Sequence, residues 1–590
     1  MNYNPLLMID FYKATHADQY PKDIKKIYSP GTPRLSRLDD IKELVYFGGQ
    51  GFCKEVLIKA FNENFFNRPE DEVAAEYERV MKYTLGPGTY KTERIRALHR
   101  LGYLPIEVFT IPEGMSTAIG VPQSVFVNTH PDFAWLTNTL ETCYSAFIWH
   151  IQVSAEVGRR YRKVVEKWVE KTCDNDVRAA RMIGDFSMRG QHCPESAITS
   201  SAAWLLSFLN TATVPAIMWL EDNYNCNIEN EEVGFGAIST EHSVMCSNYS
   251  IDGDEITHIR RLLTEIYPNN NFSMVSDSYD YWNLVINLLP QLKEEIINHN
   301  GTLLIRGDSG NPVDILAGKK IEWLEDGEID FSNPENVGNW LCGYAWDNYI
   351  EDKVTVYLSQ EGKFYKVVFV PEWGYEYGDC SNSKYGFVDH YNIEWNEIEP
   401  TAELLGTVWA LDQIVGHTVN EKGYKVLDPH LRAIYGDSII PDYAEEAYRR
   451  LEAQGYAANN IVMGAGSMSM MALVCEDNGQ LCFAGKVNGT NPGPYTRDTF
   501  GYAIKATYGE DSNGNPVMIQ KQPKALSWKK SPKGCIVVAP DGQSYTDGWT
   551  YEEAHGEGVE NLLECVFRNG EMVKETTLAE VRNRMWSEGF

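Results

Sequence analysis

Short apolar runs that end in turn residues recur along this chain. The run at residues 303–305 leads directly into Arg306, Gly307 and Asp308. A short apolar run closed by glycine or by polar turn residues predicts a buried strand with a loop at its carboxyl end. Four further runs have this form, at residues 183–186, 272–276, 431–435 and 461–463.

Apolar positions at helical spacing alternate with these predicted strands. Residues 155–171 place Val157, Tyr161 and Trp168 on one side of a helix, with arginines between them on the predicted wet face. A second helix is predicted between Pro441 and Gly455. Strand, loop, helix and strand in succession predict an α/β fold, here an irregular (β/α) barrel with its site at the carboxyl ends of the strands.

Residues 317–400 interrupt this alternation. They are acidic, contain five tryptophans, and include hairpin-like runs at residues 354–358 and 364–370. We interpret this segment as an inserted small β-rich module.

The charge of the chain limits its partners. With 52 basic and 83 acidic residues, its formal net charge is −31. This argues against nucleic acid and anionic membranes as partners, and any phosphate site must be a local basic pocket. The scattered cysteines indicate reduced thiols rather than a zinc site. The start of the chain has no signal peptide, and the uncharged residues 196–220 contain Pro215, so we predict a cytoplasmic protein without a membrane span.

Charged side chains follow two of the predicted strands. Arg306 and Asp308 alternate at the end of one strand, where they suit a polyanionic, sugar-bearing ligand; a surface salt bridge is the alternative. Asp277 and Asp280 follow another strand. Such a pair binds Mg²⁺ or a ribose, or it caps the next helix.

Two further patterns combine an aromatic ring with a charged group. Phe186 lies close to Arg189, which fits stacking on a planar ring beside an anion, although Phe186 also fits a core position. His242 follows Glu241, so the imidazole is either structural or oriented by that carboxylate.

Glycine and lysine residues near the end of the chain indicate an anion site. The loop containing Gly464, Gly466 and Ser467 follows a predicted strand, and its backbone N–H groups can cradle a phosphate. Positive charge is concentrated further on, in contrast with the rest of the chain, at Arg497, Lys505, Lys521 and Lys529.

Taken together, these residues resemble the nicotinamide phosphoribosyltransferase family. The resemblance covers almost the whole chain except residues 317–400 and a shorter piece near 468–495. The matching motifs occur in the family's order, and they are Asp10-Phe11-Tyr12-Lys13, Asp185-Phe186-x-x-Arg189-Gly190, Glu241-His242-Ser243, Ser276-Asp277-Ser278-Tyr279-Asp280, Arg306-x-Asp308-Ser309-Gly310-Asn311-Pro312 and Tyr435-Gly436-Asp437.

The resemblance implies a type II phosphoribosyltransferase fold, an irregular α/β barrel with a β-rich domain built from the terminal regions. It also implies a homodimer with active sites at the subunit interface. The expected divisions are 1–150 for the N-terminal part of the β-rich domain, 151–316 and 401–490 for the barrel, 317–400 for the insertion, and 491–590 for the C-terminal part of the β-rich domain with its basic segment.

The resemblance also implies roles for individual residues. Phe186 and the partner subunit's Tyr12 would sandwich a pyridine ring, and Asp277 would act at the reaction centre. The other residues would hold substrate: Arg306, Arg189 and His242 the pyrophosphate and amide groups; Asp308, Gly436 and Asp437 the ribose; Gly464, Gly466, Ser467 and Arg497 the 5′-phosphate; Arg34, Lys505, Lys521 and Lys529 the pyrophosphate; with Asp10, Glu241, Ser273 and Ala212 completing the site.

Two cofactors follow from the same resemblance. Mg²⁺ would sit on the pyrophosphate, and His242 matches the family's histidine that is phosphorylated from ATP. The reaction gives the ribosyl C1 oxocarbenium character as pyrophosphate leaves, so it requires cations on the leaving group and carboxylates near the ribose.

The chain departs from the family pattern at Asn210-Thr211-Ala212-Thr213, where the family has Gly-Thr-Asp-Thr and its Asp accepts a hydrogen bond from the carboxamide. Three interpretations therefore stay open. The first is phosphoribosyl transfer to nicotinamide, with nicotinate as a variant. The second is transfer from ADP-ribose 1-pyrophosphate, which would give NAD directly. The third is a non-catalytic nucleotide-binding regulator.

Overall fold

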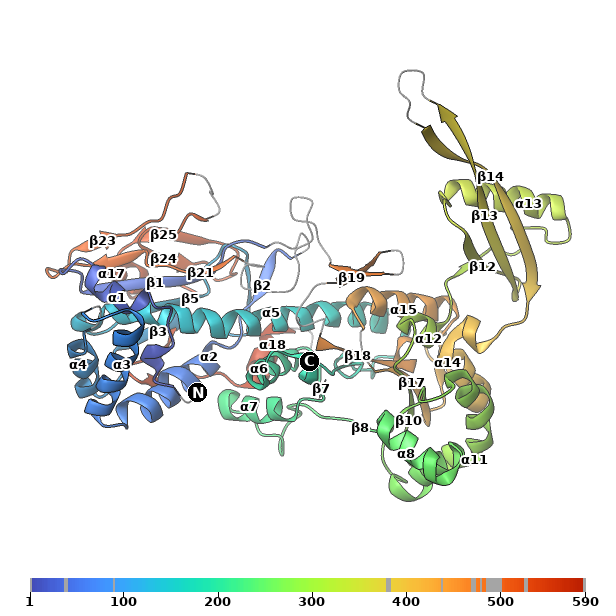
Figure 1. Cartoon of the computed structure of the whole chain (residues 1–590), viewed down its shortest axis with the longest axis horizontal. Helices are drawn as coiled ribbons and strands as arrows, with labels where there is room; N and C mark the ends of the chain where they lie inside the picture. Colours follow the sequence, from blue (N-terminus) through green and yellow to red (C-terminus); the bar gives the residue numbers. More distant parts are fainter. Residues whose placement is uncertain are drawn as a thin grey trace. The chain divides into compact units, whose positions relative to one another are not determined.

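The computed structural model describes residues 3–36, 41–88, 91–377, 384–436, 439–467, 474–477, 480–483, 501–524 and 529–586. Contacts divide the chain into two compact units (Figure 1). The first comprises Met1–Lys163, Ile183–Gly236 and Ala465–Phe590, and the second comprises Val164–Met182 and Ala237–Gly464.

An antiparallel sheet forms the centre of the first unit. Segments from both ends of the chain contribute to it, because β1 (Lys26–Pro33) pairs with β5 (Ser124–Asn128) on one side and with the late strands β21 and β22 on the other. The strand order is β23 (Pro516–Met518), β22 (Tyr508–Glu510), β1, β5, β3 (Ile106–Thr110), β26 (Glu564–Arg568) and β27 (Glu571–Met572), with β21 (Tyr502–Ile504) beside β1.

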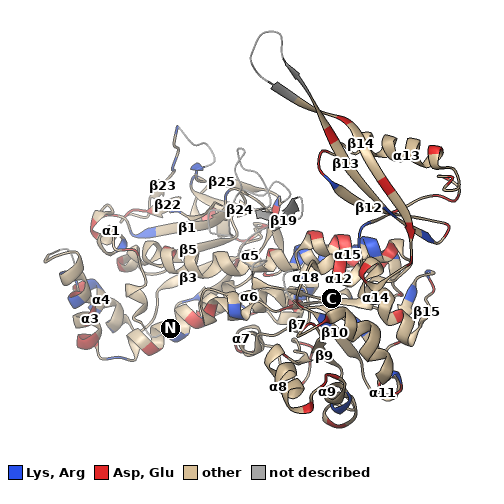
Figure 2. Ribbon diagram, turned by 45° about the vertical axis from the view of Figure 1, so that its right-hand side comes forward, with Lys and Arg blue, Asp and Glu red and all other residues tan. Residues whose placement is uncertain are grey.

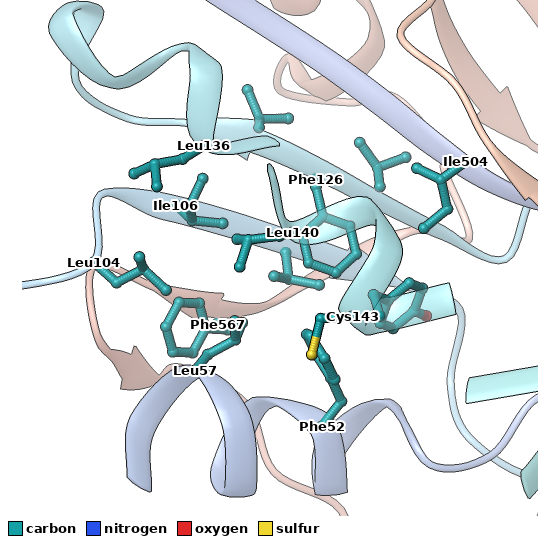
Figure 3. Packing of buried hydrophobic residues seen from close by; sticks show 14 of the residues in the cluster. Phe52, Leu57, Leu104, Ile106, Phe126, Leu136, Leu140, Cys143, Ile504 and Phe567 are labelled. Carbon is teal, nitrogen blue, oxygen red and sulfur yellow. The ribbon is translucent and has the colours of Figure 1, made fainter. Parts of the chain in front are cut away.

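Helices pack their apolar side chains against this sheet. Figure 3 shows Leu57 beside Phe567, and Leu140 and Cys143 of helix α5 near Phe126. Phe52 also packs against Phe126, with ring centroids 6.1 Å apart. Burying such large side chains contributes about 1.5–3 kcal/mol each. The described helices of this unit are α1 (Lys13–Gln19), α2 (Gly49–Phe52) with its π-helical extension Cys53–Ala60, α3 (Glu70–Thr84), α4 (Glu93–Leu101), the beginning of α5 (Trp135–Thr172), α6 (Pro194–Trp204), α7 (Val214–Tyr224), α17 (Tyr551–His555) and α18 (Leu578–Met585).

Helix α5 corrects one detail of the sequence interpretation. Residues 155–171 are helical as predicted, but Arg162 is buried rather than on a wet face. Its guanidinium donates a 2.6 Å hydrogen bond to the Ser207 carbonyl and lies over the ring of Trp586. Residues remote in sequence thus bury this arginine, and helical periodicity cannot show that.

The second unit is built on a parallel sheet. Five of its strands follow one another in the spatial order β8 (Ile238–Ser239), β9 (Phe272–Val275), β10 (Leu303–Gly307), β17 (Leu431–Tyr435) and β18 (Ile461–Ala465). Four of the predicted runs, at residues 272–276, 303–305, 431–435 and 461–463, form strands here. The run at residues 183–186 forms β6 (Ile183–Asp185) in the first unit, and the predicted α/β fold class is confirmed. The helices between them are α8 (His242–Asp252), α9 (Ile256–Arg261), α10 (Tyr281–Asn283), α11 (Lys293–Asn298), α12 (Pro312–Ala317), α14 (Ala402–Val415) and α15 (Pro441–Ala453).

The sequence after β10 contains an N-cap residue, Asn311, which sets the start of helix α12. The Asn311 side chain accepts hydrogen bonds from the backbone N–H groups of Val313 and Asp314, and Pro312 occupies the first turn. These N-cap contacts hold the loop that carries Asp308 between a strand end and a helix start. Both ends of the loop are therefore anchored, which restricts the position of Asp308.

Residues 321–398, inside the predicted insertion, form a small sheet with its own core. The strand order is β11 (Ile321–Trp323), β12 (Val354–Gln360), β13 (Lys363–Tyr377) and β14 (Lys384–Ile398), and α13 (Pro334–Asp347) supplies apolar side chains to the same core. Phe331 stacks on Tyr365 with ring centroids 3.6 Å apart. Acidic residues occur along β13 and β14 (Figure 2).

Among the residues that the structure describes, no helix combines the length with the apolar composition that a membrane span requires.

Candidate active site

Arg306 and Asp308 lie at the carboxyl end of β10, in the second unit. The Arg306 guanidinium donates to the Ser239 hydroxyl at 2.7 Å and to the Thr240 carbonyl at 3.2 Å. Its Nη2 lies 3.6 Å from Oδ2 of Asp308. The Ser239 hydroxyl also accepts a 2.6 Å hydrogen bond from Ser273, so Arg306 and Ser273, both predicted site residues, donate to the same oxygen. This bonding fixes the direction of the guanidinium and leaves its Nε without a partner among the described residues.

His242 begins helix α8 shortly after β8, which lies on the other side of β9 from β10. Its Nδ1 is in hydrogen-bond contact with the Ser278 hydroxyl at 3.0 Å. Its Nε2 lies 3.9 Å from Asp277 and 3.8 Å from Asp308. The neighbouring Glu241 carboxylate accepts a hydrogen bond from the Ser243 hydroxyl. Two carboxylates and a hydroxyl therefore surround the half-exposed imidazole.

Asp277 is the buried acid of this cluster. Its side chain is only 5% exposed, and its Oδ2 accepts a 3.1 Å hydrogen bond from the backbone N–H of Asp308. Its Oδ1 is buried and has no hydrogen-bond partner among the described residues. A buried carboxylate oxygen without a partner is costly, so a free acceptor here suits a ligand that donates to it or carries positive charge.

Gly436 follows β17 and lies against the carboxylate of Asp308. A Cβ atom at this position would be 2.1 Å from Oδ1 of Asp308 and 2.9 Å from Cδ of Arg306. Only glycine therefore leaves both side chains where they are. Asp437 and Arg497, the predicted ribose and phosphate ligands, lie outside the described residues.

A second set of predicted residues lines a cavity in the first unit. The cavity has a volume of about 550 Å³, and its walls include Asp10, Tyr12, Arg34 and Lys505. Lys521 is close enough to act electrostatically on Lys505, whereas Lys529 is not among the lining residues. Burial and the neighbouring cations Lys521, Lys13 and Arg34 lower the pKa of Lys505, and Glu141 opposes that shift. Cations crowded in this way suit a polyanion.

A buried ion pair lies in the wall of this cavity. The Lys13 ammonium contacts the Glu141 carboxylate, and both side chains are at most one-tenth exposed. Asn138 donates to Glu141 at 3.3 Å and contacts His16 at 2.7 Å. Burial raises the pKa of the Glu141 carboxyl, and Lys13 opposes that effect.

The third set belongs to a short parallel strand pair, also in the first unit. β6 (Ile183–Asp185) is followed directly by Phe186, which is half-buried, and Arg189 is exposed one turn later. Ala212 is exposed directly after β7 (Asn210–Thr211). Gly190 lies so close to Ser467 that a Cβ atom would come within 1.9 Å of the serine Oγ, so the residue after Arg189 packs against the end of the predicted glycine loop. Gly464 is buried in β18, and Gly466 separates that strand from Ser467.

Comparison with known proteins identifies a family. The profile of the Nicotinate phosphoribosyltransferase (NAPRTase) family matches residues 182–340. A protein named nicotinamide phosphoribosyltransferase from Acinetobacter baylyi is 32% identical over 99% of this chain and 97% of its own length. The chain belongs to the nicotinamide phosphoribosyltransferase family. A relative of the same name from Mycoplasma pneumoniae is 26% identical over 79% of this chain and 86% of its own length.

A solved structure was also found by fold comparison. The crystal structure of nicotinate-nucleotide pyrophosphorylase from Pyrococcus furiosus aligns with 99% of this chain and 95% of that chain, at 10% identity and a TM-score of 0.48.

Four residues of the two sites were not predicted from the sequence, namely Ser239, Thr240, Ser278 and Glu141. Ser278 lies inside the quoted motif around Asp277, and Ser239 and Thr240 directly precede Glu241, so adjacency to a motif was the available signal. Glu141 had no such signal, because it lies in the middle of the long helix α5. The structure places Glu141 in the cavity wall, where it contacts Lys13.

Proposed function

We propose that this protein is a nicotinamide phosphoribosyltransferase. It transfers the 5-phosphoribosyl group of phosphoribosyl pyrophosphate to nicotinamide and releases nicotinamide mononucleotide and pyrophosphate. The observation that carries the proposal is the cluster of Asp277, Arg306, Asp308 and His242 at neighbouring strand ends. Full-length similarity to relatives of that name supports the same activity.

The proposed chemistry assigns a task to each member of the cluster. The bond between ribosyl C1 and the pyrophosphate oxygen breaks, and a bond from the pyridine nitrogen to C1 forms. Asp277, with its unpartnered Oδ1, stabilises the positive charge that develops on the ribose, and Asp308 accepts from its hydroxyls. Arg306 holds the leaving group or the amide, while Phe186 and Tyr12 provide aromatic faces for the pyridine ring.

Mg²⁺ is part of this proposal, held mainly by the substrate's pyrophosphate. Among the described residues, no group of three or more His, Cys, Asp or Glu side chains forms a metal site. Asp277 and Asp308 nevertheless offer the hard oxygen atoms that Mg²⁺ prefers, and Mg²⁺ commonly keeps only one or two carboxylates beside substrate phosphates. When bound, the ion would neutralise charge on the leaving group.

A crossed substrate assay tests the function. Purified protein is incubated with nicotinamide or nicotinate, each with phosphoribosyl pyrophosphate or ADP-ribose 1-pyrophosphate, and products are measured by mass spectrometry. We expect nicotinamide mononucleotide from the first combination as the main product. NAD as the main product of the larger donor would support the second interpretation, and no product from any combination would contradict the enzyme assignment.

His242 is proposed to accept a phosphoryl group from ATP. We expect His242→Ala to lose the stimulation of transfer by ATP while slow ATP-independent transfer remains, because the variant lacks the imidazole but keeps Asp277 and Arg306. Steady-state rates with and without ATP measure this, together with detection of phosphohistidine. Full ATP stimulation in the variant would exclude this role.

We further propose a homodimer whose active sites combine residues of both subunits. Tyr12, Arg34 and Lys505 line a cavity of their own in the first unit, whereas Asp277 and Arg306 belong to the second. The cavity supplies cations and an aromatic ring, and the second-unit cluster supplies the acids, so neither set alone provides every group that the reaction requires.

Mixing two inactive variants tests the shared site. If sites are shared, Tyr12→Ala and Asp277→Asn subunits should form hybrid dimers with one intact site, and random exchange at equal amounts restores about a quarter of wild-type activity. Activity is measured after co-refolding, and native mass spectrometry confirms subunit exchange. Proven hybrids without recovered activity would contradict the shared site.

A further inference from the structure

A buried tyrosine packs against the strand end that carries Arg306 and Asp308. Gly307 lies between these two residues, as the last residue of β10. A Cβ atom on Gly307 would be 3.5 Å from Cε2 of Tyr281 and 3.0 Å from Cγ2 of Ile315. Tyr281 itself is only 9% exposed. The ring and the isoleucine therefore leave the backbone of Gly307 little room to move toward them.

This strand end is also bonded to the loop that carries Asp277. The Asp308 N–H donates to the Asp277 carboxylate at 3.1 Å, and the Ser276 N–H donates to the Arg306 carbonyl at 2.8 Å. A shift of the backbone at Gly307 would therefore move the guanidinium and both carboxylates of the proposed reaction centre.

The Tyr281 hydroxyl is held by a chain of two hydrogen bonds. Thr407 is buried, and its hydroxyl donates to the Ile315 carbonyl at 2.7 Å. Since a threonine hydroxyl has one proton, the tyrosine is the donor in the 2.7 Å contact between Tyr281 and Thr407. Burial and the nearby Asp277 carboxylate raise the pKa of Tyr281 against the effect of the Thr407 bond, so the phenol keeps the proton that it donates.

Thr407 is fixed in turn, because it lies beside the two ends of the insertion. The chain enters the insertion near Gly318 and returns near Gly406, which interrupts helix α14, and both glycines have positive φ, 78° and 88°. A Cβ atom on Gly406 would be 2.4 Å from the Gly318 nitrogen, so the two backbones are in direct contact. The Lys319 N–H also donates to the Leu404 carbonyl at 2.8 Å. The threonine that accepts from Tyr281 thus belongs to a closely packed crossing of the chain.

We propose that Tyr281 and Thr407 are positioning residues, whose shared hydrogen bond holds the strand end at Gly307 in the geometry that transfer requires. This inference rests on the proposed function and adds two residues that act through the backbone of the reaction centre. Loss of either hydroxyl breaks the same contact, so the ring is released and the strand end can shift.

The test is kcat of the full-length protein at saturating substrates, measured beside the melting temperature. We expect Tyr281→Phe and Thr407→Val each to lower kcat about tenfold, because a displacement of about 1 Å costs about 100-fold and loss of one hydroxyl permits a smaller shift. The double variant should lose no more than Thr407→Val alone, since valine already removes the acceptor of the Tyr281 proton. Thr407→Ser keeps the hydroxyl and should retain kcat.

Tyr456→Phe is the matched control. Tyr456 is 1% exposed, and its hydroxyl donates to Asp412 of the same helix α14 at 2.6 Å. This tyrosine precedes β18, at the amino end of that strand, whereas the reaction centre lies at the carboxyl ends of the parallel strands. The control should lower the melting temperature at least as much as Tyr281→Phe and leave kcat unchanged.

Three results would overturn the inference while leaving the proposed function intact. The first is a kcat of Tyr281→Phe within about twofold of wild type despite a lower melting temperature, which shows a purely structural role. The second is an equal loss of kcat in Tyr281→Phe and Tyr456→Phe. The third is additive losses in the double variant, since the two hydroxyls would then act separately. A wild-type protein inactive with every base and donor would overturn the proposed function, and this inference with it.

Discussion

Asp277→Asn should lower kcat by about 100- to 1,000-fold, the range that loss of one preorganised electrostatic contact produces. The substitution keeps the shape of the side chain but removes its charge. The asparagine oxygen can still accept from the backbone N–H of Asp308, now at 3.1 Å from the carboxylate, so the loop should hold its position. What is lost is the negative charge on the unpartnered oxygen that would face the ribosyl cation.

The measurement is kcat at saturating substrates, together with the melting temperature. Asp280→Asn in the same loop is the matched control, because Asp280 caps helix α10 through a 2.9 Å hydrogen bond from the Asn283 N–H. We expect the control to retain activity with a small loss of stability. Comparable losses of kcat in both variants would indicate a disturbed loop and not a catalytic carboxylate.

Gly436→Ala should reduce kcat/KM for phosphoribosyl pyrophosphate by more than about 100-fold, since a 1 Å displacement of a catalytic group can have this effect. The new Cβ would overlap Oδ1 of Asp308 and press on Arg306. The backbone of Gly436 is not in the left-handed region, so alanine introduces no backbone strain. The protein should therefore fold, with its carboxylate moved away from the ribose.

Two helical glycines provide controls for this substitution. Gly338→Ala and Gly343→Ala lie in helix α13, where no atom would lie within 4 Å of the added Cβ. Alanine in a helix interior is more favourable than glycine by about 1 kcal/mol, so these variants should be active and slightly more stable. Steady-state kinetics and thermal unfolding measure both effects. A fully active Gly436→Ala enzyme would exclude Asp308 from ribose binding at its observed position.

The sequence by itself determined the elements of the parallel sheet. The runs at residues 303–305 and 431–435 form β10 and β17, and the helix predicted from Pro441 to Gly455 is α15. These predictions succeed because apolar periodicity, proline and glycine act over a few residues. The order of the motifs also led to the correct family, and so to a candidate set of site residues.

Only the tertiary structure decided how those residues act on one another. His242 contacts Ser278, which is 36 positions away, and Lys13 contacts Glu141 across 128 positions. The burial of Arg162 and the close approach of Gly436 to Asp308 depend on segments from different parts of the chain in the same way. Local pattern assigns each side chain to a strand end or a helix face, but contact, burial and an unpartnered oxygen are properties of the packed chain. They arise when remote segments exclude water from the same place.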